Sequence, residues 1–190
     1  WWCEGRGMQL VHGAAVGGSD AAVLLTGKGG SGKSSTALAA LLADMSYLGD
    51  DYVVVEPGSP PRLHSLYASA KVDESALERM PRLRSLVAVP PASAQDKAVL
   101  FAPRRVPGAL PLCAIVVPRI AADGARLSPL SPAAAFLALA PTTVFQLPGA
   151  GRGSTAILRE LVSAVPCYEL VLGPEPLEAV QLLRGLVSRS

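Results

Sequence analysis

The order of apolar and polar positions along the chain predicts strands and helices that alternate. Residues 8–16 and 22–25 are largely apolar and are expected to be strands, separated by a turn at 17–20. Residues 34–46 carry apolar side chains at helical spacing, which predicts a helix that buries one face against a sheet. Residues 59–72 begin in a Pro-Pro turn and are expected to continue as a short helix.

The same alternation continues in the second half of the chain. A continuous apolar run at 112–117 predicts a central strand. The other elements expected there are a helix at 133–140 closed by Pro141, a short strand at 144–147, a helix at 154–164, a strand at 168–172 and a final helix from Pro176. We therefore expect a single α/β domain over 1–190, with a mixed β-sheet flanked by helices.

Composition and charge narrow the classes of function. Of the 190 residues, 50% are hydrophobic and 17% are charged, which is typical of one well-buried globular domain. The net charge is +2 and the arginines are scattered, so we expect no nucleic-acid partner. No apolar run approaches the roughly 20 residues that a membrane helix needs, so we expect no membrane partner either.

The cysteines indicate the compartment of the protein, and the first residues indicate whether the chain is part of a longer one. Cys3, Cys113 and Cys167 lie far apart and form no C-x-x-C motif, which favours reduced thiols in a cytoplasmic protein. The chain begins with Trp1-Trp2 and no initiator methionine, so we expect it to be the C-terminal part of a longer chain.

The stretch after the strand at 22–25 carries the first candidate chemistry. Gly27, Gly32, Lys33 and Ser34 satisfy the pattern G-x-x-x-x-G-K-[ST] of a phosphate loop (residues 27–34). Glycines let the backbone aim its N–H groups at an anion, and the following helix adds the positive end of its dipole. Lys33 is expected to reach the terminal phosphates, and Ser34 to ligate magnesium. The residues expected to bind the nucleotide are Gly27, Lys28, Gly29, Gly30, Ser31, Gly32, Lys33, Ser34 and Ser35.

A pair of carboxylates, Asp50 and Asp51, stands directly before the apolar residues 52–55. Buried strands rarely begin with paired acids unless those acids hold a cation or a proton. A solvated turn with ordinary aspartates is the alternative interpretation. Because the phosphate loop lies one helix upstream, a magnesium-binding or catalytic role is favoured.

Several other polar residues give weaker signals, and their roles stay open. They are Arg62, His64 and Lys71 in the 59–72 segment, Arg119 beyond the central strand, and Arg152 in a second glycine-rich loop at 148–153. That second loop lacks a Lys-Ser ending, so it passes close to the nucleotide or is only a turn before a helix.

Taken together, His12-Gly13, the phosphate loop and the Asp pair resemble the catalytic core of HPr kinase/phosphorylase. The resemblance is closer to its shorter bacterial homologues, which phosphorylate serine on proteins or peptides. Three segments, L-G-D-D-Y-V, R-L-H-S-L-Y-A-S-A-K and V-P-C-Y-E-L-V-L-G, are also similar to these homologues. Some of them accompany lasso-peptide biosynthesis and phosphorylate a serine of the precursor peptide. The resemblance covers most of the chain and implies the fold shared by HPr kinase and phosphoenolpyruvate carboxykinase.

The resemblance implies an ATP- and Mg²⁺-dependent serine kinase whose partner is a peptide or protein bearing a serine. Lys33 would stabilise charge on the transferred group, and Ser34 would ligate magnesium. Asp50 would accept the proton of the serine, with Asp51 as the alternative base or as a metal-linked partner. His12 would orient the aspartates or the substrate; an ordinary strand histidine is the alternative. A homo-oligomer is one of the assembly states left open.

The chain also departs from the family. It has no clear counterpart of the G-I-I-D-V segment that supports the family's dephosphorylating activity and a magnesium-binding glutamate, for which Glu56 is a possible substitute. We therefore expect kinase activity without the reverse phosphorolysis. The docking surface for HPr is not recognisable either, so HPr itself is not the expected substrate.

Two other functions compete with this interpretation. Residues 28–34 also fit K-G-G-x-G-K-[ST], the deviant loop of partitioning ATPases, in which Lys28 would reach across a dimer to the partner's nucleotide. Such proteins usually have the loop near the N-terminus and follow it with an apolar strand that ends in Asp. Here a strand bearing His12 comes first and the Asp pair begins its strand. The second competitor is a nucleotide-binding scaffold without transfer chemistry, which the intact Lys33 and Ser34 and the Asp pair disfavour.

Overall fold

The computed structural model describes residues 3–93, 96–102, 108–122, 124–144 and 152–188. The strand expected at 144–147 falls outside these ranges apart from Val144, which ends a helix instead. Most of the second glycine-rich loop, residues 148–151, also lies outside the described residues.

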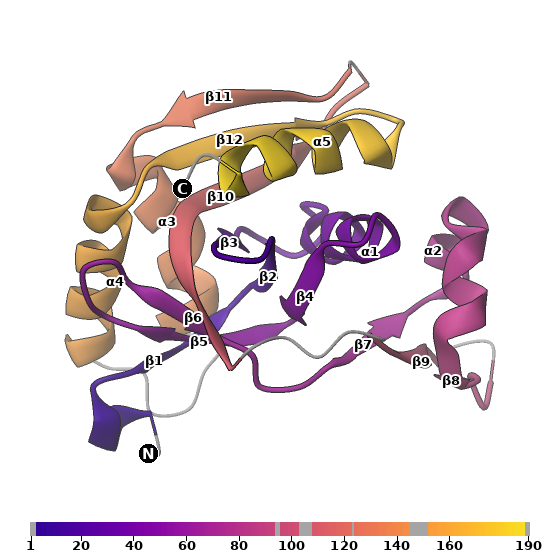
Figure 1. Cartoon of the computed structure of the whole chain (residues 1–190), viewed down its shortest axis with the longest axis horizontal. Coiled ribbons are helices and arrows are strands. Elements are labelled where there is room, and N and C mark those ends of the chain that lie inside the picture. Colours follow the sequence, from indigo (N-terminus) through magenta and orange to yellow (C-terminus); the bar gives the residue numbers. More distant parts are fainter. Residues whose placement is uncertain (1–2, 94–95, 103–107, 123, 145–151, 189–190) are drawn as a thin grey trace.

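A mixed sheet of nine strands forms the centre of the fold (Figure 1). Its order is β1 (Gln9–His12), β5 (Tyr52–Glu56), β6 (Arg62–His64), β10 (Ala109–Ile120), β3 (Ala22–Leu25), β2 (Ala14–Gly17) and β4 (Ser46–Gly49). Two further strands, β12 (Cys167–Leu172) and β11 (Arg126–Leu130), extend it from β10. Strands β3 and β12 run parallel to β10, and the other pairs are antiparallel. The α/β class and the mixed sheet are thus confirmed.

The long strand β10 holds the sheet together. Residues 109–111 pair with β6, residues 112–116 with β3, and residues 115–120 with β12. The apolar run within it is buried on both faces, as a strand with helices above and below must be. The central strand expected from the sequence is therefore confirmed, and it is longer than the apolar run.

Helices cover both faces of the sheet (Figure 1). Helices α1 (Lys33–Leu42) and α5 (Pro176–Val187) pack on one face, and α3 (Pro132–Val144) and α4 (Arg152–Ala164) on the other. A hydrophobic core lies on each face of the sheet, and successive residues of β3 point into opposite cores. Val23 and Leu25 belong to the core with α1 and α5, and Leu24 to the core with α3 and α4. No helix among the described residues has the length and apolar character to cross a membrane.

A second, three-stranded sheet lies beside α1. Its order is β7 (Ser69–Val72), β9 (Ala98–Phe101) and β8 (Val87–Val89), and it is accompanied by α2 (Glu74–Arg79) and the 3₁₀ helix η2 (Pro81–Leu86). A further 3₁₀ turn, η1 (Glu4–Arg6), precedes β1. The short helix expected within 59–72 is wrong, because that segment forms β6 and β7. Its burial alternates with period two, as Ala70 and Val72 are buried while Lys71 is exposed.

The helix expected at 34–46 is shorter, and the strand expected at 8–16 is divided. Helix α1 ends at Leu42 because Asp44 adopts a left-handed conformation with φ 61°, and the Met45 N–H donates to the Ala40 carbonyl at 3.0 Å. The chain then enters β4. In the first segment, Gly13 separates β1, which pairs with β5, from β2, which pairs with β3 and β4.

Pro141 was expected to close the third helix and instead lies inside α3. A proline removes the hydrogen bond to the carbonyl four residues earlier, which here belongs to Leu137. Both residues are exposed, and Leu137 keeps 72% of its surface accessible. Water can therefore satisfy the freed carbonyl, and the helix continues to Val144.

We expect Gly13→Ala to lower the free energy of unfolding by about 1–3 kcal/mol, because the site is already filled. A Cβ at this position would lie 2.7 Å from the Leu25 carbonyl oxygen, which is backbone and cannot move aside cheaply. Urea denaturation measures the change. Gly185→Ala in α5 is the control: its Cβ meets nothing within 4 Å, so it should stabilise by about 0.5–1 kcal/mol. Equal stability of Gly13→Ala and the native chain would contradict the close approach.

Candidate active site

The phosphate loop joins β3 to α1 and requires its glycines. Gly27, Gly30 and Gly32 have φ values of +134°, +75° and +101°, which side-chain-bearing residues rarely adopt. A Cβ on Gly32 would also lie 2.3 Å from the Leu172 side chain. Helix α1 begins directly after Gly32, so its unpaired N–H groups lie at the end of the loop.

Lys33 folds back over the phosphate loop. Its Nζ donates to the carbonyl oxygens of Gly27 at 2.8 Å and Lys28 at 3.1 Å. Burial lowers the pKa of this ammonium, while Asp50 and Asp51 act in the opposite direction. The cation expected to reach terminal phosphates is therefore held inside the loop, near both aspartates.

Asp50 and Asp51 occupy a corner of the main chain between β4 and β5. Asp51 has φ +68°, a conformation that is uncommon outside glycine, and the Tyr52 N–H donates to the Asp50 carbonyl at 2.9 Å. The Gly13 N–H donates to the Asp51 carbonyl at 3.0 Å. The corner therefore lies against the break between β1 and β2, and His12 is next to that break.

The Asp50 side chain connects this corner to the phosphate loop. Its Oδ1 accepts hydrogen bonds from the Ser34 Oγ at 3.0 Å and from the Asp51 N–H at 2.9 Å. Only 6% of the residue is exposed. Burial, followed by the charge of Asp51, raises the pKa of the Asp50 carboxyl, and Ser34, the Asp51 amide and Lys33 offset part of that rise. Asp51 itself is exposed.

His12 contributes a neutral imidazole to the same corner. Burial lowers its pKa, the nearby Lys33 ammonium lowers it further, and Asp51 opposes both. The ring lies edge-on to Tyr52, with centroids 5.8 Å apart, and its Nδ1 is buried without a hydrogen-bond partner among the described residues. The structure therefore brings together the histidine, the lysine and the Asp pair that the sequence singled out.

Three clefts lined by described residues border the phosphate loop. The central cleft, of about 310 Å³, is lined by Lys33, Ser34, Asp50 and Asp51 and by residues of β7 and α2. A cleft of about 220 Å³ begins at Ser35 and Thr36 and is otherwise largely apolar. A third, of about 500 Å³, borders Gly27 to Ser31, the end of β10 and α3.

Ser34 and Asp51, the metal ligands expected from the sequence, both line the central cleft, and their oxygen atoms are of the hard type that Mg²⁺ prefers. The described residues contain no group of three or more His, Cys, Asp or Glu side chains that could hold a metal alone. Mg²⁺ usually takes one or two protein oxygens and completes its shell with water and substrate phosphates.

The other polar residues singled out in the sequence occupy several parts of the structure. Glu56 lies at the far end of β5 from Asp51, where its Oε2 lies 2.7 Å from the His64 Nε2, so the structure does not bring Glu56 to Ser34. Arg119 pairs with Glu169 at 3.1 Å on the rim of the third cleft. Arg62 donates to the Ala109 carbonyl at 3.2 Å. Arg152 begins α4, and Lys71 lines the central cleft.

Three further residues belong to this region and were not singled out from the sequence. The Tyr67 hydroxyl donates to the Asp50 carbonyl, and Arg79 and Lys97 line the central cleft. Tyr67 falls within R-L-H-S-L-Y-A-S-A-K, a segment noted only as similar to the short homologues. Arg79 and Lys97 carry no local signal, because only the folding of α2 and β9 beside α1 brings them to the loop.

Comparison with known proteins gives a match among solved structures alone. No protein-family model matches the chain, and no curated protein matches it. The structure of the HPr(Ser) kinase/phosphatase from Coxiella burnetii matches with 10% sequence identity and a TM-score of 0.48. The match covers 95% of this chain and 89% of that one.

We expect Lys33→Met to stabilise the chain near neutral pH. The lowered pKa means that the charged ammonium costs the native state free energy. That cost vanishes as the pH rises through the window between the lowered pKa and the usual 10.5. The variant's advantage in the free energy of unfolding should therefore shrink as the pH rises toward 10.5. Urea denaturation at several pH values measures it.

Lys71→Met is the matched control, because Lys71 is exposed and its replacement should change stability by less than about 0.5 kcal/mol. A Lys33→Met variant less stable than the native chain at neutral pH would contradict the prediction. The two carbonyl hydrogen bonds of Lys33 would then outweigh the cost of its burial.

Proposed function

We propose that this chain is an ATP-dependent kinase domain that transfers the γ-phosphate to a serine hydroxyl of a protein or peptide. The observation that carries the proposal is the hydrogen bond between Ser34 Oγ and Asp50 Oδ1. It holds a buried carboxylate beside a complete phosphate loop and its lysine. Phosphoryl transfer needs positioning and charge stabilisation more than covalent chemistry, and these groups supply both.

The residues of the phosphate loop and those of the Asp50–Asp51 corner would have different roles in the reaction. The loop amides and Lys33 bind the phosphates. When ATP binds, the Lys33 ammonium exchanges its hydrogen bonds to the Gly27 and Lys28 carbonyls for contacts with the β- and γ-phosphates. Ser34 and Asp51 would hold Mg²⁺, which when bound neutralises charge on the phosphates. His12, uncharged and adjacent to Asp51, orients the carboxylates or the acceptor.

Asp50 is the better candidate for the base that accepts the serine proton. Its Oδ1 is engaged by Ser34 and the Asp51 amide, whereas its Oδ2 makes no hydrogen bond with a described residue. The raised pKa also makes this carboxylate a stronger base than one in water. Asp51 would keep that pKa high through its charge and share in holding the metal.

The nucleoside would occupy the cleft that begins at Ser35. Lys33 reaches the β- and γ-phosphates, and the γ-phosphate must face the Asp pair, so the nucleoside leaves on the opposite side. The 220 Å³ cleft shares Gly32 and Ser35 with the central cleft, includes the apolar Leu172 and Ala179, and contains neither aspartate. Its apolar walls suit a purine ring.

The acceptor class follows from the family resemblance and is part of the proposal. A ribosomally made precursor peptide, such as that of a lasso peptide, is the first candidate, in a cytoplasmic reaction. Since Glu56 is engaged with His64 instead of Ser34, the chain is proposed to act as a kinase without the reverse phosphorolysis.

We expect Asp50→Asn to lower kcat by about 10²–10⁴, the usual contribution of a positioned base. The amide oxygen can still accept from Ser34 and Asp51, so the KM for ATP should change by only a few-fold. Asp51→Asn should cost less. The assay combines the protein, Mg²⁺, ATP and serine peptides, and mass spectrometry detects the phosphopeptide.

Asp20→Asn, an exposed turn residue, is the control and should keep full activity. Full transfer by the double variant of Asp50 and Asp51 would refute the mechanism. Dimerisation that requires ATP and Lys28, with no phosphopeptide formed, would instead favour the nucleotide-switched ATPase.

The fall of kcat/KM at low pH, the acid limb of the pH profile, should follow the protonation of the Asp50 carboxylate. Its raised pKa means that kcat/KM falls, as the pH drops, at a higher pH than the usual 3.8 of an aspartate. The charge of Asp51 contributes to that rise, so Asp51→Asn should move the limb to lower pH. A limb that stays in place in Asp51→Asn would show that Asp50 is not the titrating base.

A further inference from the structure

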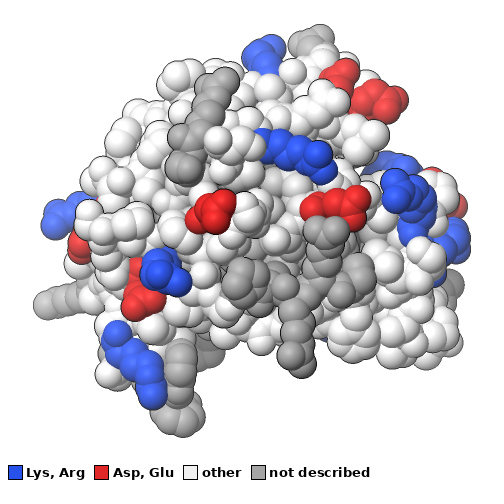
Figure 2. All heavy atoms as spheres, viewed as in Figure 1, with Lys and Arg blue, Asp and Glu red and all other residues white. Residues whose placement is uncertain are grey.

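The wall of the central cleft opposite the phosphate loop is cationic. Lys71 comes from β7, Arg79 from the end of α2, and Lys97 from the residue before β9. All three are exposed, and all three line the cleft that also holds Lys33, Asp50 and Asp51. Figure 2 shows Lys and Arg side chains gathered on the side where Figure 1 draws α2. We call these three residues the cationic wall.

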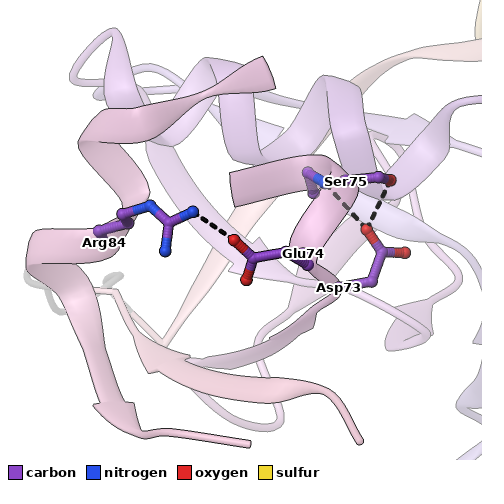
Figure 3. Close-up of polar contacts among 5 residues, drawn as sticks. Asp73, Glu74, Ser75 and Arg84 are labelled. Carbon is purple, nitrogen blue, oxygen red and sulfur yellow. Dashed lines mark hydrogen bonds and ion pairs between the residues drawn. The ribbon is translucent and has the colours of Figure 1, made fainter. Parts of the chain in front are cut away.

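Nearby acids do not neutralise the cationic wall. Within the described part of the chain, none of its three residues makes an ion pair or a side-chain hydrogen bond. Glu74 pairs with Arg84, outside the cleft (Figure 3). Asp73 caps α2, accepting from Ser75 Oγ and the Ala76 N–H, each at 2.9 Å, and is the one wall carboxylate facing Arg79 and Lys97. The cationic wall therefore carries three cations and one acid, and Asp50 and Asp51 are the other carboxylates among the described residues that line the cleft.

The elements that carry the wall are fixed relative to the Asp pair. Strands β7 and β9 pair in register, and their buried residues Ala70, Val72, Ala98 and Leu100 join the core that α1 packs into. The segment before β7 is tied to the corner, because the Tyr67 hydroxyl donates to the Asp50 carbonyl. The cations therefore face the reaction centre from a folded platform.

The nucleotide does not account for this charge. Lys33 and the loop amides already serve the phosphates, and the proposed nucleoside cleft contains Arg79 but neither Lys71 nor Lys97. Of the three clefts described above, those two lysines line the central one, which Asp50 also lines. The group they face is therefore expected to arrive with the acceptor.

We propose that the cationic wall selects the acceptor: the kinase takes serine peptides that carry aspartate or glutamate side chains close to the serine. This inference rests on the proposed kinase function. Carboxylates entering the cleft would meet the charges of Lys71, Arg79 and Lys97, which make no ion pair with a described residue. The wall binds and orients the acceptor and takes no part in the proton transfer.

Three serine peptides of equal length, with both ends capped, test the proposal. The residues around the serine are acidic in the first peptide, the matching amides in the second, and lysines in the third. With the native chain, kcat/KM should be at least about tenfold higher for the acidic peptide than for the amide peptide, and lowest for the lysine peptide. The difference should shrink as salt is added.

Variants assign that preference to the wall. Lys71→Gln, Arg79→Gln and Lys97→Gln should each reduce the acidic-to-amide ratio by several-fold through the KM for the peptide, and the triple variant should abolish it. Arg82→Gln, an exposed arginine on η2 outside the cleft, should keep the native ratio. In Lys71→Glu the preference should turn toward the lysine peptide, which a loss of folding would not produce.

The failures of the two proposals can be told apart. If the native chain phosphorylates all three peptides equally, the acceptor inference is wrong and the kinase function stands. If the native chain phosphorylates neither these three peptides nor any other serine peptide, the kinase function is wrong, and the acceptor inference, which rests on it, is wrong too. If the wall variants raise the KM for ATP as much as the KM for the peptide, the cations serve the nucleotide and the inference is overturned.

Discussion

The site depends on the hydrogen bond from the Ser34 hydroxyl to the Asp50 carboxylate. It joins two parts of the chain that fold for different reasons. Ser34 is placed by the glycines that let the loop turn into α1, and Asp50 by the pairing of β4 with β2 and β5 with β1. A carboxylate this deeply buried needs donors, and Ser34 and the Asp51 amide provide them. The bond thus compensates burial and sets the geometry of the proposed reaction.

Sequence patterns predicted the parts of the fold in which local and tertiary preferences agree. The apolar run inside β10 and the helical spacing of α5 each extend over enough residues to show their period. Strand β4 has only four residues, too few to display alternation, and its pairing with β2 decides its conformation. Strand β6 has only three, and it is defined by β5 and β10 on either side. The prediction that Pro141 ends its helix was wrong, because the residue is exposed and water can replace the hydrogen bond that a proline cannot donate.

Some residues of the candidate site could be found from the sequence, and others are brought there only by the tertiary fold. Gly27 to Ser34 and the Asp pair carry recognisable spacing, so the order of residues alone is enough to single them out. It is not enough for Tyr67, Arg79 and Lys97, since each reaches the cleft only through the path of the second sheet. Glu56 shows the reverse error: it follows the Asp pair closely in sequence, yet a strand extends about 3.4 Å per residue and carries it away.

The hydrogen bond from the Gly13 N–H to the Asp51 carbonyl joins two backbones. It uses no side-chain atom, and position 13 must lack a Cβ for a separate reason, the close approach of the Leu25 carbonyl oxygen. The hydrogen bond would survive a change of the side chain at position 12 or 51, because neither takes part in it. The shape of the corner and the chemistry that the corner presents are therefore specified by different atoms of the same residues.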